Sequence, residues 1–324
     1  MTDNSKLRRA FLTRDDEFFT RYKDIEVEIC QYKKYLKGKI VYCNCDNFRS
    51  DFIKYFTKNF KALGLKGLIT SFYSAKRRAY VAEYSLVGDK LVKKCTFLMG
   101  HGEYNSPELV PFVKKADFII TNPPFSKMRD FMDFLHVNKK KFIILAPITT
   151  VVYKNCFPYF LSGDYHCAIN VRRPRWFYID HAQVETGSIK MDRDTGKFQA
   201  PLGNVYWFTN LDVKPAGKLE LTKKYSPEEY PELDNFHAIN VSITNDIPVD
   251  YDGIMAVPIT FMHYWDKDQF LLVGSSRLPE LCPELVKPPK KTVDKNGNTL
   301  RRKPTSCYLH GREIYSRLFI RWKR

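Results

Sequence analysis

The sequence predicts an α/β protein with a largely parallel sheet, followed by a mixed or mostly β region. Short apolar, β-branched runs alternate with amphipathic helical patterns in the first half of the chain. Strands that alternate with helices form parallel pairs, with helices covering both faces of the sheet. From about residue 165 the chain changes to short aromatic and β-branched runs separated by turn signals. We expect one domain over residues 1–165 and a second region over residues 166–324.

A helix is expected before the first strand, over residues 15–36. Asp16 is a candidate N-cap for this helix. Apolar side chains recur at helical spacing at Ile25, Ile29, Tyr32 and Leu36.

The first βαβ unit is predicted over residues 39–73. KIVYCNC (39–45) and GLITSFY (67–73) are short apolar runs typical of buried strands. Between them, residues 49–60 are predicted to be helical, because phenylalanines recur at every fourth position at Phe52, Phe56 and Phe60.

A hairpin and a second βαβ unit follow. Residues 79–98 predict two strands joined by a Gly-Asp turn. DFIIT (117–121) and KFIILA (141–146) are strand candidates, and the amphipathic residues 127–137 between them predict a helix.

The second half contains turn signals at 194–197, 215–217 and 252–253. A basic segment over 287–304 contains prolines and an Asn-Gly pair, which predicts a loop or hairpin. The arginine-rich residues 312–324 after it are a strand candidate.

The charge of the chain favours a polyanionic partner. Its 324 residues include 53 Lys and Arg against 36 Asp and Glu, a formal net charge of +17. Such an excess is typical of proteins that bind nucleic acid, although a merely basic enzyme has the same composition. The N-terminus lacks a signal-peptide pattern, and no segment is apolar for the ~18 residues that span a bilayer, so we expect a cytoplasmic protein.

The cysteines do not predict a metal site. The eight cysteines are scattered, and the only close pair, Cys43 and Cys45, has neither zinc nor redox spacing. We expect reduced, mostly buried thiols and no metal.

The strongest local motif is Asn122-Pro123-Pro124-Phe125, directly after the predicted strand 117–121. In open α/β sheets, ligands bind beyond the carboxyl ends of strands. The Asn122 side-chain carbonyl and the Pro123 backbone carbonyl can accept hydrogen bonds from an adenine amino group as it becomes tetrahedral, and Phe125 can stack on the ring. Two prolines fix φ and hold these acceptors in place. The alternative is a rigid turn, since Asn and Pro are common turn formers.

Longer stretches make the resemblance specific. They include DEFFTRYKDIE, VYCNCDNFR, TNPPFS, NVYWFTNLDV, LTKKY and residues 235–270. On these the chain resembles the EcoRI-type adenine-specific DNA modification methyltransferases across nearly its whole length. The resemblance implies a Rossmann-like methyltransferase fold with a C-terminal target-recognition region. It also implies S-adenosylmethionine as methyl donor and N6 of a flipped-out adenine in double-stranded DNA as acceptor.

The resemblance also implies a donor-binding site. Phe18, Phe19 and Thr20 correspond to residues at the methionine end of the donor, and Cys43, Asn44 and Asp46 stand at the first-strand turn beside it. The two phenylalanines are alternatively helix-packing aromatics, and Asp46 is alternatively an N-cap. Glu103, in the loop 100–104, is the candidate for the donor's adenine; a loop with no such role is the alternative.

Basic residues in the second half are candidates for phosphate contacts, which supply affinity and salt dependence rather than sequence choice. The DNA-binding candidates are Arg172, Arg173, Arg175, Arg301, Arg302 and Lys303, with Lys290, Lys291, Arg317, Arg321, Lys323 and Arg324 as further members of the set.

Two other functions compete with this interpretation. One is methylation of RNA adenine or of a protein glutamine, and the other is a catalytically silent DNA-binding protein. The basic second half favours nucleic acid, and the complete Asn122–Phe125 loop favours catalysis. We expect a monomer that modifies DNA in a restriction-modification system, with any cognate restriction endonuclease acting on the same site without stable association.

Overall fold

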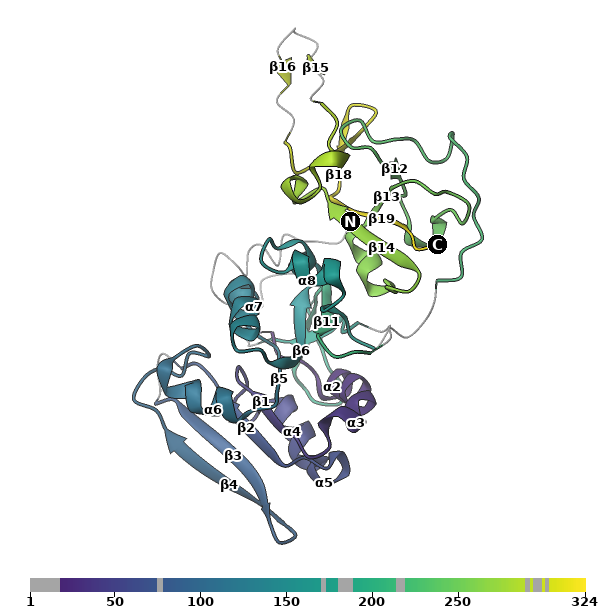
Figure 1. Ribbon diagram of the computed structural model, residues 1–324. Helices are drawn as coiled ribbons and strands as arrows, with labels where there is room; N and C mark the ends of the chain where they lie inside the picture. The colour runs from purple at the N-terminus through teal and green to yellow at the C-terminus, as the bar shows by residue number, and fades with distance from the viewer. Residues whose placement is uncertain are drawn as a thin grey trace. The chain divides into compact units, whose positions relative to one another are not determined.

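The computed structural model describes residues 18–74, 78–169, 173–179, 189–213, 219–288 and 303–324, and the backbone of 292–293 and 299–300. The chain forms two compact units (Figure 1). Unit 1 comprises Met1–Pro147 and Ala168–Val213, and unit 2 comprises Ile148–Cys167 and Lys214–Arg324. This division differs from the single boundary expected at residue 165. Residues after 167 return to unit 1 because β11 (Val205–Thr209) pairs with β6 (Lys141–Pro147).

Unit 1 is built on a large mixed sheet in the strand order β4-β3-β2-β1-β5-β6-β11 (Figure 1). Its four central strands are parallel, as the alternation of strands and helices predicts. They are β2 (Gly67–Ser71), β1 (Ile40–Cys43), β5 (Phe118–Thr121) and β6. The class is therefore mixed α/β.

Antiparallel strands flank the parallel centre. The expected hairpin is formed by β3 (Tyr80–Val87) and β4 (Lys90–Phe97). Its turn places Gly88 at φ 57°, a conformation that glycine adopts without a Cβ clash. On the other side of the parallel strands, β11 runs antiparallel to β6.

The helix expected over residues 15–36 begins later and is interrupted. It consists of α2 (Tyr22–Ile29), the 3-10 turn η1 (Cys30–Tyr32) and α3 (Lys33–Leu36). Its predicted apolar stripe is confirmed, because Ile25, Ile29, Tyr32 and Leu36 are fully buried. The proposed cap, Asp16, lies outside the described residues.

The remaining helices of unit 1 are short. They are α4 (Asp51–Lys58), α5 (Phe60–Leu63), η2 (Pro107–Leu109), α6 (Val110–Lys115), η3 (Phe125–Lys127) and α7 (Met128–Val137). The helix predicted over 49–60 is thus α4 and α5, and the three predicted phenylalanines are buried.

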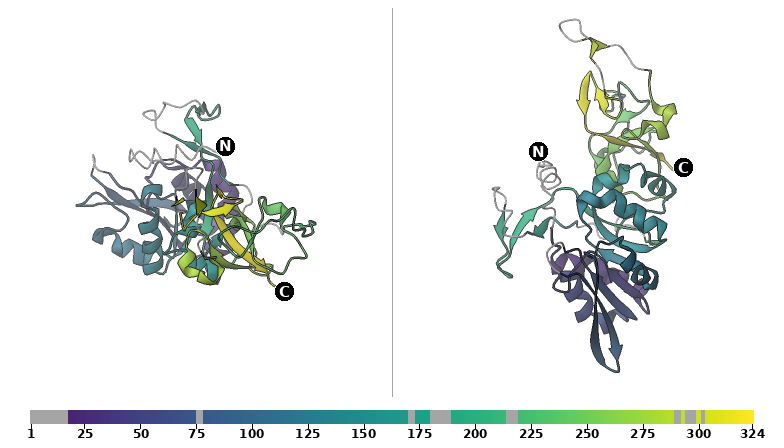
Figure 2. Two further views of the ribbon diagram at one scale, coloured as in Figure 1. Left: turned by 90° about the horizontal axis from the view of Figure 1, so that it is seen from above. Right: turned by 90° about the vertical axis from the view of Figure 1, so that its left-hand side faces the viewer.

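A small antiparallel sheet completes unit 1, in the order β8-β10-β9 (Figure 2). It contains β8 (Trp176–Tyr178), β9 (Lys190–Met191) and β10 (Phe198–Pro201). Phe19 joins it through an antiparallel bridge to Tyr178. The turn expected at 194–197 connects β9 to β10.

Unit 2 is rich in β-structure, as the texture of the sequence predicts. Its main sheet has the order β12-β13-β19-β14. The strands are β12 (Ile239–Asn240), β13 (Met255–Pro258), β19 (Arg317–Trp322) and β14 (Phe270–Ser275). Residues 312–324, expected as one strand, form β18 (Arg312–Ile314) and β19.

Unit 2 also contains short elements outside this sheet. Two further antiparallel pairs are β15 (Thr292–Val293) with β16 (Thr299–Leu300), and β17 (Cys307–Leu309) with β18. The others are η4 (Ile148–Val152), α8 (Phe157–Ser162), β7 (His166–Cys167), η6 (Thr244–Asp246), η7 (Ile259–His263), η8 (Pro279–Leu281) and η9 (Pro283–Leu285).

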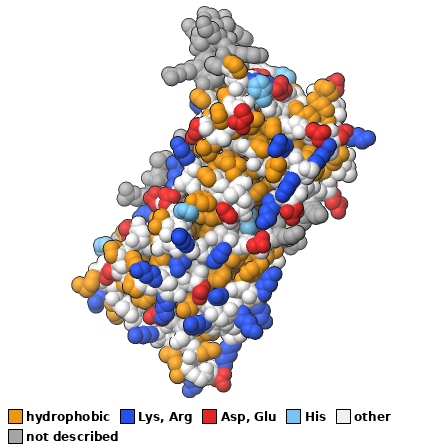
Figure 3. All heavy atoms as spheres, in the orientation of Figure 1, with side chains coloured by type: hydrophobic (Ala, Val, Ile, Leu, Met, Phe, Trp, Pro, Cys, Tyr) orange, Lys and Arg blue, Asp and Glu red, His pale blue; other side chains and the backbone are white. Residues whose placement is uncertain are grey.

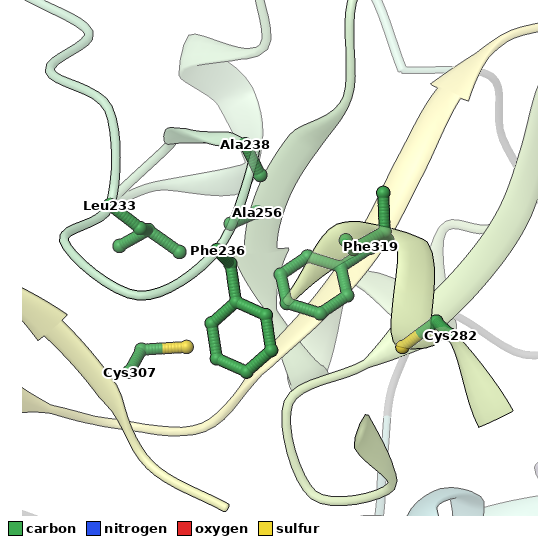
Figure 4. Packing of buried hydrophobic residues seen from close by; sticks show 8 residues of the cluster. Leu233, Phe236, Ala238, Ala256, Cys282, Cys307 and Phe319 are labelled. Atoms are coloured by element: carbon green, nitrogen blue, oxygen red, sulfur yellow. The ribbon is translucent and has the colours of Figure 1, made fainter. Parts of the chain in front are cut away.

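One face of β19 is covered by the hydrophobic core of unit 2 (Figure 4). The rings of Phe236 and Phe319 pack with their centroids 4.9 Å apart, and Cys282 and Cys307 fill the space around them. Gly274 is required at this contact, since a Cβ there would lie 2.7 Å from the Cys282 sulfur. All eight cysteines are free and five are buried, as expected.

None of the helices in the described ranges combines the length and the apolar composition that crossing a bilayer requires.

Candidate active site

The predicted catalytic loop lies where the sequence places it, at the carboxyl end of a buried parallel strand. Asn122 directly follows β5, and Phe125 begins η3, which leads into α7. Strand β1 is the parallel neighbour of β5, and Asn44 to Asp46 follow β1. Both segments therefore leave the sheet at the same edge, where ligands bind in such sheets.

The Asn122 side chain is held in one orientation. Its Nδ2 donates a hydrogen bond of 2.5 Å to the backbone carbonyl of Phe18. Since only the NH2 group can donate, this contact assigns the two ends of the amide. Oδ1 is buried and has no hydrogen-bond partner among the described residues. A buried acceptor without a partner costs about 1–3 kcal/mol, so Oδ1 is placed to receive a donor from outside the chain.

The rest of the loop is rigid and packed. Pro123 is buried, and the Pro124 carbonyl accepts a hydrogen bond of 3.1 Å from the Lys127 amide. The Phe125 ring is 2% exposed and lies nearly parallel to the Phe18 ring, with 6.4 Å between centroids. The segment before α2 thus contacts the loop twice, through the Phe18 carbonyl and through the Phe18 ring.

Asp46 ties the end of β1 to the catalytic loop. Its carboxylate accepts a 2.6 Å hydrogen bond from Thr121 Oγ1, and the Ser50 hydroxyl and the backbone N–H of Asn122 also donate to it. Burial raises the pKa of Asp46 to about 7, because desolvation outweighs these hydrogen bonds. The alternative role of Asp46 as a helix cap is wrong, since Ser50 caps α4 by accepting from the Ile53 amide.

Asn44 and Cys43 are inaccessible to bulk solvent. Asn44 is 1% exposed, and its Nδ2 has no partner among the described residues. Cys43 is fully buried in β1, and burial raises the pKa of its thiol well above the usual value. Cys43 is therefore a neutral packing residue at the base of this edge.

The segment 18–20 lies outside the helix that follows it. Phe19 and Tyr178 exchange two backbone hydrogen bonds of 2.8 Å, which fix the segment to the small sheet. Thr20 is 4% exposed, and its hydroxyl has no partner among the described residues. Because α2 begins at Tyr22, neither Phe18 nor Phe19 belongs to that helix.

Thr20 Oγ1, Asn44 Nδ2 and Asn122 Oδ1 share one property. Each is a buried polar atom without a partner in the described chain, and each belongs to a residue expected to bind donor or target. Such atoms are uncommon in folded proteins unless a ligand or water completes them.

Glu103 is linked to the exit of the catalytic loop. Its carboxylate forms a 3.2 Å ion pair with Lys127 of η3, and both side chains are about half exposed. The start of the loop 100–104, which contains Glu103, is held by Glu108, a residue that sequence reasoning missed. Its carboxylate accepts from the amides of Met99 (2.7 Å) and Gly100 (2.9 Å), which lowers its pKa. Thr121 and Ser50 were also missed, although Ser50 before an amphipathic helix is a recognisable cap signal.

Comparison with known proteins decides the family. A family model described as adenine-specific methyltransferase EcoRI matches residues 6–323. The chain belongs to this family. It is 38% identical over 290 residues to the type II methyltransferase M.EcoRI of Escherichia coli, covering 83% of this chain and 89% of that protein. No solved structure matches significantly.

Two mycoplasma proteins are also similar. The chain is 32% identical to the type II methyltransferase M.MgeORF184P of Mycoplasma genitalium, covering 86% of this chain and 89% of the relative. It is 31% identical to the type II methyltransferase M.MpnI of Mycoplasma pneumoniae, covering 86% and 88%. As a member of the EcoRI family, the chain is an adenine-specific DNA methyltransferase.

The DNA-binding candidates of this EcoRI-family methyltransferase are only partly described. Arg172, Arg301 and Arg302 lie outside the described residues. The Arg173 and Arg175 side chains are exposed in unit 1, and Arg173 lies over the Tyr206 ring at 5.4 Å. Lys303 is exposed in unit 2. Figure 3 shows Lys and Arg side chains spread over the visible face rather than gathered in one patch, so the charge on that face does not locate the DNA.

Metal ligands were not expected. Within the described ranges, no group of three or more His, Cys, Asp or Glu side chains is arranged to hold an ion.

Proposed function

We propose that this enzyme transfers the methyl group of S-adenosylmethionine to N6 of a flipped-out adenine in double-stranded DNA, with Asn122, Pro123, Pro124 and Phe125 as the catalytic loop. The observation that carries the proposal is the state of Asn122. Its NH2 group is engaged by the Phe18 carbonyl, and its carbonyl oxygen is buried and unpartnered.

This arrangement suits the adenine amino group. The lone pair of that nitrogen is delocalised into the ring, so it becomes nucleophilic as it turns tetrahedral. Asn122 Oδ1 accepts a hydrogen bond from one N–H of the amino group, and the Pro123 carbonyl accepts a hydrogen bond from the other N–H. Because the Phe18 contact already holds the amide, the acceptor does not reorganise during the reaction.

Buried polar atoms at the same sheet edge fit the methyl donor. Thr20 Oγ1 and Asn44 Nδ2 are unpartnered donors suited to the carboxylate of its methionine end, and Asp46 is an acceptor suited to its ammonium. Phe18, Phe19 and Glu103 complete the proposed donor-binding set, with Cys43 as a packing residue at the base of the same sheet edge. When bound, the donor supplies a methyl group on a sulfonium, an excellent leaving group for direct displacement.

Phe125 has a further requirement. Its ring is 2% exposed and faces Phe18, so a target base that stacks on Phe125 displaces the Phe18 ring. Flipping the base costs a few kcal/mol in unstacking and unpairing, which contacts to the DNA backbone offset. Arg173, Arg175 and Lys303, with Arg172, Arg301 and Arg302, are the proposed contributors.

Strand order and direction support a Rossmann-like methyltransferase fold for unit 1. The four parallel strands β2, β1, β5 and β6 place both β1 and β5 near the centre of the sheet, where the donor and catalytic segments meet. We assign target recognition to the β-rich C-terminal region. The enzyme acts as a monomer in a restriction-modification system, and any cognate endonuclease acts on the same site without stable association.

Labelled methyl transfer tests the proposal. The purified protein is incubated with labelled S-adenosylmethionine and, in separate reactions, with unmethylated duplex DNA, RNA or protein. We expect transfer to duplex DNA, and loss of at least about a hundred-fold in rate for Asn122→Ala with DNA binding retained. Asn138→Ala is the matched control, because Asn138 Nδ2 also donates to a backbone carbonyl (Phe134) but follows α7 away from the loop. Transfer to RNA or protein alone would refute the DNA assignment.

A further inference from the structure

Arg317 is an unusual residue in unit 2. It is the first residue of β19 and is only 7% exposed. A guanidinium carries five N–H donors and stays charged near neutral pH, so burial of arginine normally requires a carboxylate partner. Among the described residues no ion pair with Arg317 is found, and its one side-chain hydrogen bond is 3.1 Å from Nε to Asn240 Oδ1.

The fold explains why this arginine is buried. Arg317 is two residues before Phe319 on the same strand, so the two side chains lie on the same face of β19. That face carries the hydrophobic core of unit 2, including Phe236 and Cys307 (Figure 4). Burial lowers the pKa of Arg317, and among the described residues the neighbouring Cys307 acts in the opposite direction.

Asn240 positions the guanidinium. The Asn240 Nδ2 donates to Ser242 Oγ at 3.0 Å, which leaves Oδ1 for Arg317 Nε. The backbone of Arg317 is equally fixed, because its amide donates to Ser276 Oγ at 3.0 Å and its carbonyl accepts from the Ser276 amide at 3.0 Å. The Arg317 side chain is thus preorganised, and its two terminal nitrogens have no acceptor among the described residues.

Three of the four strands bring polar residues to this end of the sheet. β12 and β13 are parallel and end at Asn240 and Pro258, whereas the antiparallel β19 begins there with Arg317. β14 pairs antiparallel with β19 and ends at Ser275. The residues next along the chain are open to solvent: Ile243 is 59% exposed, Tyr315 is 84% exposed, and Arg277 is exposed.

We propose that Arg317, oriented by Asn240, is a DNA-binding residue at this edge of unit 2, where its free nitrogens bind a pair of acceptors on the duplex. The inference rests on the proposed function of the enzyme. A phosphate and the O6/N7 edge of a guanine both offer two acceptors that match the guanidinium fork. Tyr315, Ile243 and Arg277 lie close along the chain to these strand ends and are exposed residues of the same edge.

The other C-terminal candidates differ from Arg317. Arg324 pairs with Asp252 and donates to the Val249 carbonyl, so its charge is already used within the chain. Lys323 Nζ donates to the Lys267 carbonyl. Arg321 is exposed on the same strand. Only Arg317, of these four, is both buried and without a carbonyl or carboxylate acceptor among the described residues, apart from the Asn240 side chain.

The decisive variant is Asn240→Asp. It gives Arg317 a carboxylate partner and can still bond Ser242, so unit 2 keeps or gains thermal stability. If Arg317 binds DNA, the new carboxylate neutralises it and the affinity for a labelled duplex that the wild-type enzyme methylates falls about ten-fold or more. Arg317→Gln should lower the affinity equally if the variant folds. Arg321→Gln is the control at an exposed position, and we expect it to change the affinity less than three-fold, because one solvated charge contributes little.

The readout separates the two acceptors. If the affinity falls equally for all duplex sequences, and the slope of log affinity against log salt concentration decreases by about one, Arg317 binds a phosphate. Loss that is confined to duplexes with one G·C pair, with relaxed choice at that position, identifies a guanine edge. Wild-type affinity in Asn240→Asp overturns the inference. Failure of the wild-type protein to bind any duplex refutes the proposed function instead.

Discussion

Neutralising Asp46 by Asp46→Asn should change the pH dependence of stability in a definite direction. Burial raises the pKa of this carboxyl from 3.8 to about 7 in the folded protein. Between these pH values the native state holds a proton that the unfolded chain has released. The stability that Asp46 contributes is therefore fully present below about pH 3.8 and is lost as the pH rises through about 7.

The magnitude follows from the shift. One pKa unit corresponds to 1.36 kcal/mol, so the whole shift is worth up to about 4 kcal/mol. Between pH 5 and pH 7.5 the wild-type enzyme should lose about 2–3 kcal/mol of unfolding free energy relative to Asp46→Asn. Asparagine is close in size and keeps one oxygen for Thr121 and the Asn122 amide, so the comparison isolates the ionisation of Asp46.

Urea unfolding of both proteins across this pH range is the assay. The difference between the two stability curves, rather than either curve, is the measured quantity, because other groups titrate in both proteins. Parallel curves would show that Asp46 is ionised throughout and that hydrogen bonds from Thr121, Ser50 and Asn122 outweigh desolvation. A difference that grows in the opposite direction would refute the sign of the argument.

Three further predictions concern the donor and the packing. S-adenosylmethionine is cationic, so its binding favours the ionised form of Asp46. Calorimetry with S-adenosylhomocysteine, which keeps the ammonium group, should therefore show that the affinity of the wild type rises from pH 6 to pH 8. The affinity of Asp46→Asn should rise less over the same range. The pKa shift of Glu108 has the opposite direction to that of Asp46, because hydrogen bonds lower it. The stability of the wild type should therefore fall more than that of Glu108→Gln as the pH drops through and below 4.5. Equal acid denaturation of the two proteins would contradict this. Gly274→Ala places a Cβ 2.7 Å from the Cys282 sulfur and 2.8 Å from its Cβ, and should cost about 1–3 kcal/mol in thermal unfolding. Adding Cys282→Gly removes both atoms and should restore part of this loss; additive losses would argue against the clash.

The sequence pattern within a segment was sufficient to predict those strands and helices whose structure depends mainly on that segment. The strands at 40–43, 67–71, 118–121 and 141–147 and the helix at 128–137 follow from runs and periodicities within each segment. The first helix was predicted less accurately: α2 begins at Tyr22, and a 3-10 turn at residues 30–32 interrupts it, because the ends and irregular turns of helices are less clearly encoded than their apolar period.

The sequence by itself determined the sheet-forming pattern, the strand-end position of Asn122-Pro123-Pro124-Phe125 and, through long matching stretches, the family. Tertiary structure decided which atom of Asn122 is available, because the Phe18 carbonyl that orients the amide is 104 residues away. It also joined Asp46 to Thr121 across 75 residues and buried Arg317 with no carboxylate partner in the part of the chain that the structure describes. Such contacts between distant segments depend on how strands and helices pack, and no local period in the chain encodes them.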